Sequence, residues 1–284
     1  MATFYNQATL SFGGNVVNSN TTEAELLSGL GLTKTAITAT YSENGNVVYA
    51  ITLQNMGSAT YDDLTLKDDL GAYTVGAITV VPLTYVAGSV LYYINGVLQA
   101  APAVSTVGNL EFSGIDVPAG GTTTLIYEVQ ANAFAPMAAG SSITNTASTD
   151  AGAGVGVLTD TATVTVTEAP ELTIAKAVCP AVINDNGTLT YTIIVQNHGN
   201  VPIVATDGVI ISDLFNPILT GITVTLNGTE LDVGTGYTYD TATGAFATVD
   251  GVVTVPAAAY VQDPVTGVIT TTPGVTVLTV SGTV

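Results

Sequence analysis

The sequence predicts an all-β protein, and three observations lead to this prediction. Apolar residues make up 47% of the 284-residue chain and charged residues only 9%, with valine, threonine, alanine, isoleucine and glycine dominant, a composition that favours strands. Large apolar side chains recur at every second position in residues 47–53 and 189–195, which is the period of a half-buried strand. Asn-Gly turn signals separate such stretches.

An internal repeat divides the chain into two bodies. Residues 43–57 (ENGNVVYAITLQNMG) match residues 185–199 (DNGTLTYTIIVQNHG), and the same alignment places Lys34 opposite Lys176. Short strands at this spacing are typical of Ig-like Greek-key β-sandwiches. We therefore expect two tandem sandwiches, over residues 30–168 and 169–284, after a segment formed by residues 1–29.

The last hairpin of the first body has no counterpart in the second. Residues 143–168 predict two strands beyond the point where the second copy stops, and a similar pattern opens the chain, where Asn6 precedes Lys34 much as Asn145 precedes Lys176. Residues 1–29 should thus be a donor β-hairpin and linker, although residues 21–31 also allow a helical turn. The hairpin could fold back, or it could complete the C-terminal domain of a neighbouring subunit. The second arrangement gives a head-to-tail filament.

The charge of the chain excludes two classes of partner. The formal net charge is −19, with 22 acidic and 3 basic residues. No cationic surface exists to bind nucleic acid or an anionic membrane. We expect no signal peptide, because no basic region precedes an apolar core at the N-terminus, and no apolar run is long enough to span a bilayer.

Several stretches resemble a bacterial surface-repeat family of unknown function, common in Gram-positive anaerobes: ATFYNQATLSF, LTYTIIVQNHG, YYINGVLQAAP and the twin strands TKTA and AKAV. The two-repeat form, at 28.7 kDa, is similar to the major subunits of clostridial spore appendages. The resemblance implies a structural subunit of the spore or cell surface, assembled in the mother-cell cytoplasm, and no enzyme or cofactor. Its partners would be itself and an anchoring or tip protein.

Each repeat also carries a lysine, an acid and an asparagine that resemble the trio of isopeptide-forming Ig-like domains in Gram-positive adhesins and pili. The first trio is Lys34, Asp69 and Asn145, and the second is Lys176, Asp213 and Asn6 of an incoming chain. The resemblance implies that an apolar pocket lowers the lysine pKa, that the neutral amine attacks the asparagine amide, and that the acid shares a proton as ammonia leaves. The first bond would be intramolecular and the second intermolecular.

An ordinary alternative stays open for these residues. Each lysine could form a buried ion pair with its aspartate while the asparagine hydrogen-bonds within a turn. Asp68 could also replace Asp69 as the first acid, although strand alternation would point these neighbours to opposite faces.

Other candidate sites are weaker. With His198 and Cys179 as the only histidine and cysteine, a catalytic triad, a zinc site and an intrachain disulfide are excluded, and no metal site is expected. We interpret His198 as a loop residue and Cys179 as a small core residue. The acids at 62–69 lack the spacing of a calcium loop, which favours a solvated strand edge.

Two classes of function remain. The first is a self-assembling structural subunit of an extracellular filament or ribbon, joined by donor-strand exchange and locked by Lys-Asn isopeptide bonds. The second is a monomeric adhesin-type binding module of a cell-surface protein. The two differ in whether the purified chain forms fibres or stays a monomer.

Overall fold

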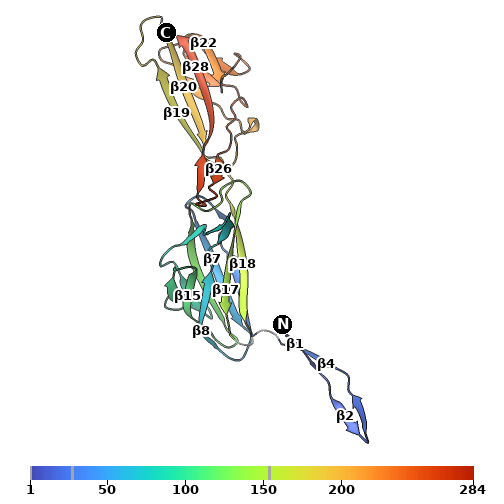
Figure 1. Cartoon of the computed structure of the whole chain (residues 1–284). Helices are drawn as coiled ribbons and strands as arrows, with labels where there is room; N and C mark the ends of the chain where they lie inside the picture. Colours follow the sequence, from blue (N-terminus) through green and yellow to red (C-terminus); the bar gives the residue numbers. More distant parts are fainter. Residues whose placement is uncertain (1, 27–28, 153–154) are drawn as a thin grey trace. The chain divides into compact units, whose positions relative to one another are not determined.

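The computed structural model describes residues 2–26, 29–152 and 155–284 and confirms the all-β prediction (Figure 1). Within these residues the one helical element is the short 3-10 turn Ala205–Asp207, and no helix is long and apolar enough to cross a membrane. The chain divides into two compact units. Unit 1 comprises residues up to 135 together with 142–165, and unit 2 comprises residues 136–141 together with 166–284.

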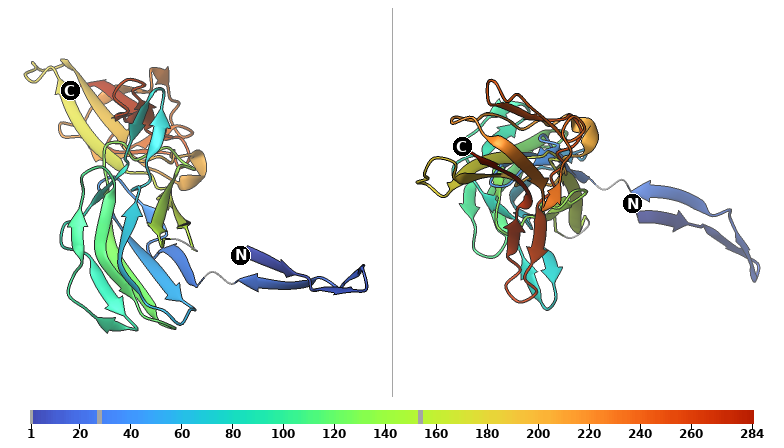
Figure 2. Two further views of the ribbon diagram at one scale, coloured as in Figure 1. Left: turned by 60° about the horizontal axis from the view of Figure 1, so that its bottom comes forward. Right: turned by 90° about the horizontal axis from the view of Figure 1, so that it is seen from above.

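The N-terminal segment is a β-hairpin in two parts, drawn in dark blue in Figures 1 and 2. Its strands are β1 (Ala2–Asn6) paired with β4 (Thr22–Leu26), and β2 (Thr9–Phe12) paired with β3 (Asn15–Asn18). Residues 22–26 are therefore strand, and the helical turn is wrong for them. At the tip, Gly13 and Gly14 have φ of 52° and 83°, as a tight hairpin turn requires.

The described side chains of this hairpin are exposed, including large apolar ones. Leu10, Phe12, Val16 and Val17 are each more than half exposed. An isolated two-stranded hairpin is only marginally stable in water. Burying its apolar side chains against the unpaired edge of another sheet would therefore stabilise the hairpin.

Unit 1 is a sandwich of two antiparallel six-stranded sheets. The first has the order β13-β12-β16-β7-β5 with β11 also on β16, and the second has the order β14-β15-β8-β17-β18-β6. The strands are β5 (Leu30–Ala36), β6 (Thr40–Tyr41), β7 (Asn46–Asn55), β8 (Tyr61–Asp68), β11 (Leu83–Tyr85), β12 (Leu91–Ile94), β13 (Val97–Leu98), β14 (Ala103–Ser105), β15 (Leu110–Val117), β16 (Thr122–Ala131), β17 (Ser142–Asp150) and β18 (Val157–Val166). A small ribbon joins β9 (Tyr73–Val75) to β10 (Ile78–Val80).

The core of unit 1 follows from the alternation seen in the sequence. On β7, the side chains of Val47, Tyr49, Ile51 and Leu53 are fully buried, while their neighbours on the strand are less so. Strands β17 and β18 form the predicted second hairpin, and β17 lies between β8 and β18. This hairpin buries its own apolar side chains, as at Val164, so it completes both the second sheet and the core.

Unit 2 repeats the five strands along the first sheet of unit 1, without a counterpart of β11 among its described residues. Its order β19-β20-β28-β22-β23 corresponds to β5-β7-β16-β12-β13. The second sheet, β21-β25-β24, corresponds to β8-β15-β14 only. The strands are β19 (Leu172–Cys179), β20 (Thr188–Asn197), β21 (Ser212–Leu214), β22 (Thr220–Leu226), β23 (Thr229–Glu230), β24 (Tyr237–Tyr239), β25 (Ala245–Thr248), β28 (Gly274–Thr283) and a separate hairpin of β26 (Ala259–Gln262) and β27 (Ile269–Thr272).

Unit 2 therefore contains no counterpart of β17 and β18 among its described residues. The consequence is visible in burial. Every residue of β19 is exposed, whereas the corresponding β5 is largely buried or half-buried. Ile174 on β19 and Leu214 on β21 are each 65% exposed. Apolar side chains along a strand edge of this kind are a surface that natural proteins normally cover.

Candidate crosslinking site

The two lysines of the repeat lie at equivalent positions in the first sheet. Lys34 on β5 is opposite Ile51 on β7, and Lys176 on β19 is opposite the corresponding Ile193 on β20. The lysine Nζ atom lies over an aromatic ring in both units, 4.8 Å from the ring centroid of Tyr49 in unit 1. The strand pattern places each lysine toward the space between the sheets.

In unit 1 this lysine forms a fully buried ion pair. Nζ of Lys34 lies 2.5 Å from Oδ2 of Asp68, and both side chains are 0% exposed. The same carboxylate oxygen accepts hydrogen bonds from the Tyr127 hydroxyl and from Nδ2 of Asn145 at 3.4 Å. Its other oxygen accepts the backbone N–H of Leu70 at 2.8 Å.

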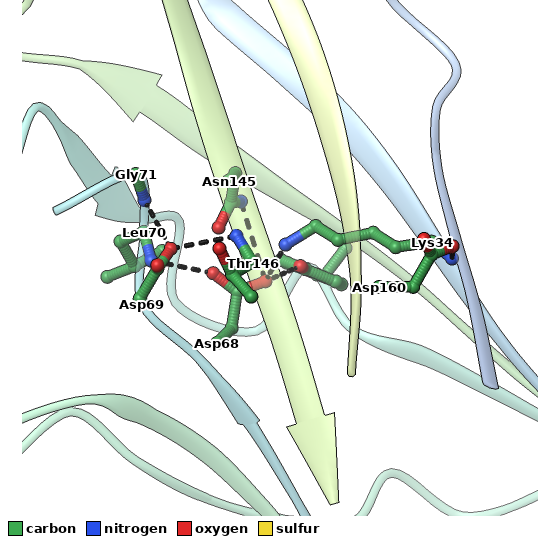
Figure 3. Close-up of polar contacts among 9 residues, drawn as sticks. Lys34, Asp68, Asp69, Leu70, Gly71, Asn145, Thr146 and Asp160 are labelled. Atoms are coloured by element: carbon green, nitrogen blue, oxygen red, sulfur yellow. Dashed lines mark hydrogen bonds and ion pairs between the residues drawn. The ribbon is translucent and has the colours of Figure 1, made fainter. Parts of the chain in front are cut away.

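Figure 3 shows how these groups meet: the Lys34 side chain extends to the carboxylate of Asp68, and the amide of Asn145 faces it from β17. One carboxylate oxygen is thus in contact with two nitrogen atoms, the lysine amine and the asparagine amide. Oδ1 of Asn145 is buried and has no hydrogen-bond partner among the described residues. An unpaired buried amide oxygen is rare and costly.

Burial sets the protonation chemistry of the site. Desolvation lowers the pKa of Lys34, and this effect exceeds the opposing attraction of Asp68. Desolvation, followed by the nearby charge of Asp68, raises the pKa of Tyr127 well above its usual value. The tyrosine therefore stays a proton donor, while the lysine loses its proton more readily than an exposed amine.

The carboxylate that contacts Lys34 and Asn145 is that of Asp68, the alternative named in the sequence analysis, and not that of Asp69. Oδ1 of Asp69 accepts the backbone N–H groups of Gly71 and Thr146, each at 2.9 Å, and so joins the turn after β8 to β17. The sequence of β8 contained a pattern that favours Asp68: Leu64 and Leu66 precede it at a spacing of two and lie on the same buried face of the strand. The repeat alignment is shifted by one residue here.

Two further contacts were missed by the sequence reasoning. One is Tyr127, which faces Tyr49 across β16 and β7 and carries no motif. The other is Asp160 on β18, whose Oδ2 accepts the backbone N–H of Lys34 at 2.7 Å. Asp160 stands in a polar, threonine-rich strand, where nothing in the pattern distinguishes it from a surface acid.

The second site is similar but open. The Lys176 ammonium contacts the carboxylate of Asp213, and its Nζ lies 4.5 Å and 5.2 Å from the ring centroids of Tyr191 and Phe215. The side chains of the ion pair are 41% and 17% exposed, against 0% for both partners in unit 1. Val280 faces Tyr191 where Tyr127 faces Tyr49, so the phenol is absent.

The remaining sequence candidates lie away from these sites. Asn6 ends β1 opposite Thr22 and is exposed. Cys179 is exposed at the end of β19, so its interpretation as a core residue is wrong for the single chain, in which no strand of the described residues covers β19. His198 is half-buried just after β20. In the part of the chain that is described, no group of three histidine, cysteine or acidic residues could hold a metal ion.

Comparison with known proteins gives only weak matches to solved structures. No family model matches the chain, and no curated protein matches it. The major pilin subunit BcpA of Bacillus cereus aligns at 13% identity and a TM-score of 0.38, covering 94% of this chain and 70% of that one. The major pilin SpaD of Corynebacterium diphtheriae aligns at 10% identity and 0.35, covering 85% and 58%.

The pilus backbone protein RrgB of Streptococcus pneumoniae aligns at 13% identity and a TM-score of 0.34, and the match covers 86% of this chain. This chain spans 55% of the length of that structure. Two other matched structures carry the names of enzymes and align with 58% and 57% of this chain. At these scores the likeness carries no argument about function, which has to come from the site itself.

Proposed function

We propose that the chain is a structural subunit of an extracellular filament or ribbon that polymerises head to tail by donor-strand exchange. The single observation that carries the proposal is the gap in unit 2. Its second sheet lacks the two strands that β17 and β18 supply in unit 1, and the lysine, the aspartate and the apolar residues beside this gap are partly exposed. Covering such an edge with a strand is a common mode of protein association.

The register of the N-terminal hairpin supports it as the occupant. In unit 1, Asn145 pairs with Ala162 across the hairpin, and in the N-terminal hairpin Asn6 pairs with Thr22. The residues two positions before and after Asn145 are Ile143 and Ala147, and those two positions before and after Asn6 are Phe4 and Ala8. The hairpin therefore carries small and apolar residues in the positions that β17 buries.

Insertion would change the environment of Lys176. In unit 1 the hairpin removes the lysine and its acid from water, and desolvation then lowers the pKa of the amine. In unit 2 the ammonium is still solvated. The incoming hairpin would therefore bring Asn6 to the site and remove water from the Lys176 amine. The site would become reactive only after a partner has bound.

The chemistry proposed for both sites is an amide exchange that needs no cofactor. In unit 1 the neutral Nζ of Lys34 attacks Cγ of Asn145, the new Cγ–Nζ bond forms, and the Cγ–Nδ2 bond breaks. Oδ2 of Asp68 contacts both nitrogens, so it can take the proton from Nζ and give it to the leaving Nδ2, which departs as ammonia. In unit 2 the corresponding groups are Lys176, Asp213 and Asn6 of the incoming chain.

Irreversible bonds of this kind suit a fibre on a spore or cell surface, which is where we place the assembly. Once formed, the amide gives kinetic stability that strand pairing alone lacks. The lone cysteine of the chain rules out an intrachain disulfide for this purpose. The filament's partner is the same chain, with an anchoring or tip protein at its end.

The test uses assembled fibres of the full chain, boiled in detergent with reductant and separated by size. Wild type should give a ladder of multimers, and Lys176→Ala and Asn6→Ala should give monomer. Lys67→Ala is the matched control, because Lys67 forms a half-exposed ion pair with Glu111 on the surface of unit 1; this variant should keep the ladder. A wild type that stays monomeric in electron micrographs would instead support the adhesin-type binding module.

A further inference from the structure

The completing hairpin of unit 1 holds the reactive lysine by its backbone as well as by its side chain. Oδ2 of Asp160 accepts the N–H of Lys34 at 2.7 Å. Asp160 lies on β18, directly opposite Ala147 of β17 and two residues from Ala162, the partner of Asn145. The strand that returns from the asparagine thus fixes the strand that carries the lysine.

The lysine N–H is available for this contact because of the pairing pattern of β5. In an antiparallel pair, residues alternate between those that bond across the pair and those whose N–H and C=O turn outward. The carbonyl of Gly29 accepts the N–H of Met56 at 2.8 Å, and the carbonyl of Glu171 accepts the N–H of His198 at 2.8 Å. Gly29 and Glu171 each lie five residues before the lysine of their strand, and both bond across the strand pair. Each lysine therefore belongs to the alternate set of residues, so the N–H of Lys176 also points away from β20.

A polar residue stands at the matching place in the N-terminal hairpin. Asn6 pairs with Thr22, and the residue two positions before Thr22, as Asp160 is two positions before Ala162, is Asn20. In the free hairpin the register shifts by one between its two parts, so Ser19 bonds to Ala8, and Asn20 takes the place of Asp160 when the register of β1 and β4 continues. Asn20 is exposed and follows β3 in the break between the two parts of the hairpin. Its side chain carries an amide oxygen that accepts the same hydrogen bond as a carboxylate oxygen.

We propose that Asn20 of the incoming hairpin accepts the backbone N–H of Lys176 and so sets the register of the inserted strands. This inference rests on the proposed strand exchange and adds a positioning residue to it. A strand that slips by one residue turns its side chains to the opposite face, and a slip by two brings Phe4 or Ala8 to the lysine in place of Asn6. Only the register that Asn20 selects brings the amide of Asn6 to the amine.

The experiment measures how fast full-length chains form detergent-resistant dimers, together with mass mapping of the joined residues. Asn20→Ala should slow the Lys176–Asn6 bond about tenfold, the effect expected for one hydrogen bond. Asn20→Asp, which restores the acceptor found in unit 1, should react close to the wild-type rate. Asn15→Ala, an equal truncation at the exposed tip of the hairpin, is the matched control and should also react normally.

The results separate the two proposals. If wild type forms the mapped bond and Asn20→Ala forms it equally fast, the role of Asn20 is wrong and strand exchange stands. Equal slowing of Asn20→Ala and Asn15→Ala, or a failure of Asn20→Asp to restore the rate, would also overturn the register role. If wild type forms no such bond, the proposed crosslink is itself refuted, and the inference with it.

Discussion

Removing the amine of Lys34 should destabilise unit 1 through two separate effects. The first is loss of the proposed covalent bond to Asn145, which would close a loop of about 110 residues. By analogy with a disulfide that closes a loop of this length, the bond contributes about 5 kcal/mol. The second appears only when the unit without the bond is the reference: there the Lys34 amine is the cation beside the fully buried Asp68, and breaking a buried ion pair from one side costs about 3–5 kcal/mol.

Two variants separate these effects. Asn145→Ala prevents the covalent bond and leaves Lys34 as an amine paired with Asp68, whereas Lys34→Met prevents the bond and also removes the cation. For a unit of this size each kcal/mol shifts the unfolding temperature by about 2–4 °C. We expect the transition of unit 1 to fall by about 10–20 °C in Asn145→Ala and by at least about 6 °C more in Lys34→Met. Adding Asp68→Asn to Lys34→Met should recover much of the second loss, because no buried charge remains.

The assay is calorimetry of the full chain combined with intact mass. The transition of unit 2 serves as an internal control, because none of these substitutions touches it. The unassembled wild-type monomer should be lighter than the encoded sequence by one ammonia, and monomers of both variants should have their encoded masses. An Asn145→Ala protein with the wild-type mass deficit and transition would refute the bond. A Lys34→Met protein as stable as Asn145→Ala would refute the contribution of the ion pair.

Three further predictions follow from the same contacts. Asp68→Asn should abolish the loss of ammonia in unit 1, while Asp69→Asn should retain it at a cost of about 1 kcal/mol; the opposite pattern in intact mass would return the acid to Asp69. In the Asn145→Ala background, burial keeps the Lys34 pKa below its unfolded value of 10.5. The unfolded chain therefore binds more protons than the folded chain as the pH rises toward 10.5. The free energy of unfolding of unit 1 should increase over this range by at most about 1.4 kcal/mol per pH unit. Denaturant unfolding between pH 7 and 9.5 should show this slope and lose it when Lys34→Met is added; equal slopes would argue against a lowered pKa. Deleting residues 1–27 should prevent fibres but leave the mass deficit of unit 1, since that unit's hairpin is internal; fibres that persist would contradict strand donation.

Much of the fold could be predicted from the sequence, because the two copies of the repeat share the same pattern of alternating strand residues. The match between residues 43–57 and 185–199 identified β7 and β20, and through them the two lysines at one position of the sheet. The unmatched hairpin at 143–168 predicted the strands that unit 1 has and unit 2 lacks. These features depend on local periodicity, which a single sequence records directly.

The details of the site depended on contacts between strands far apart in the chain. Choosing between Asp68 and Asp69 required knowing which face of β8 is buried, and the repeat alignment suggested the wrong neighbour. Tyr127 and Asp160 reach the trio only through the pairing of β16 with β7 and of β17 with β18. The exposure of Cys179 reflects the absence of covering strands, which no local pattern at residues 172–179 reveals.

The position of Lys34 and Asn145 in the chain has a mechanical consequence. Lys34 lies on the first strand of the unit 1 sandwich, and Asn145 lies on the hairpin that follows its last core strand. When the two are joined, tension that enters at β5 crosses to β17 through an amide bond and does not pass through residues 35–144. The strands between them then carry no load, and their hydrogen bonds cannot be peeled apart by pulling. Under tension a fibre of such subunits would lengthen only through the segments outside the crosslinked loops, residues 7–33 and 146–175, and the strands between Lys34 and Asn145 would not unfold.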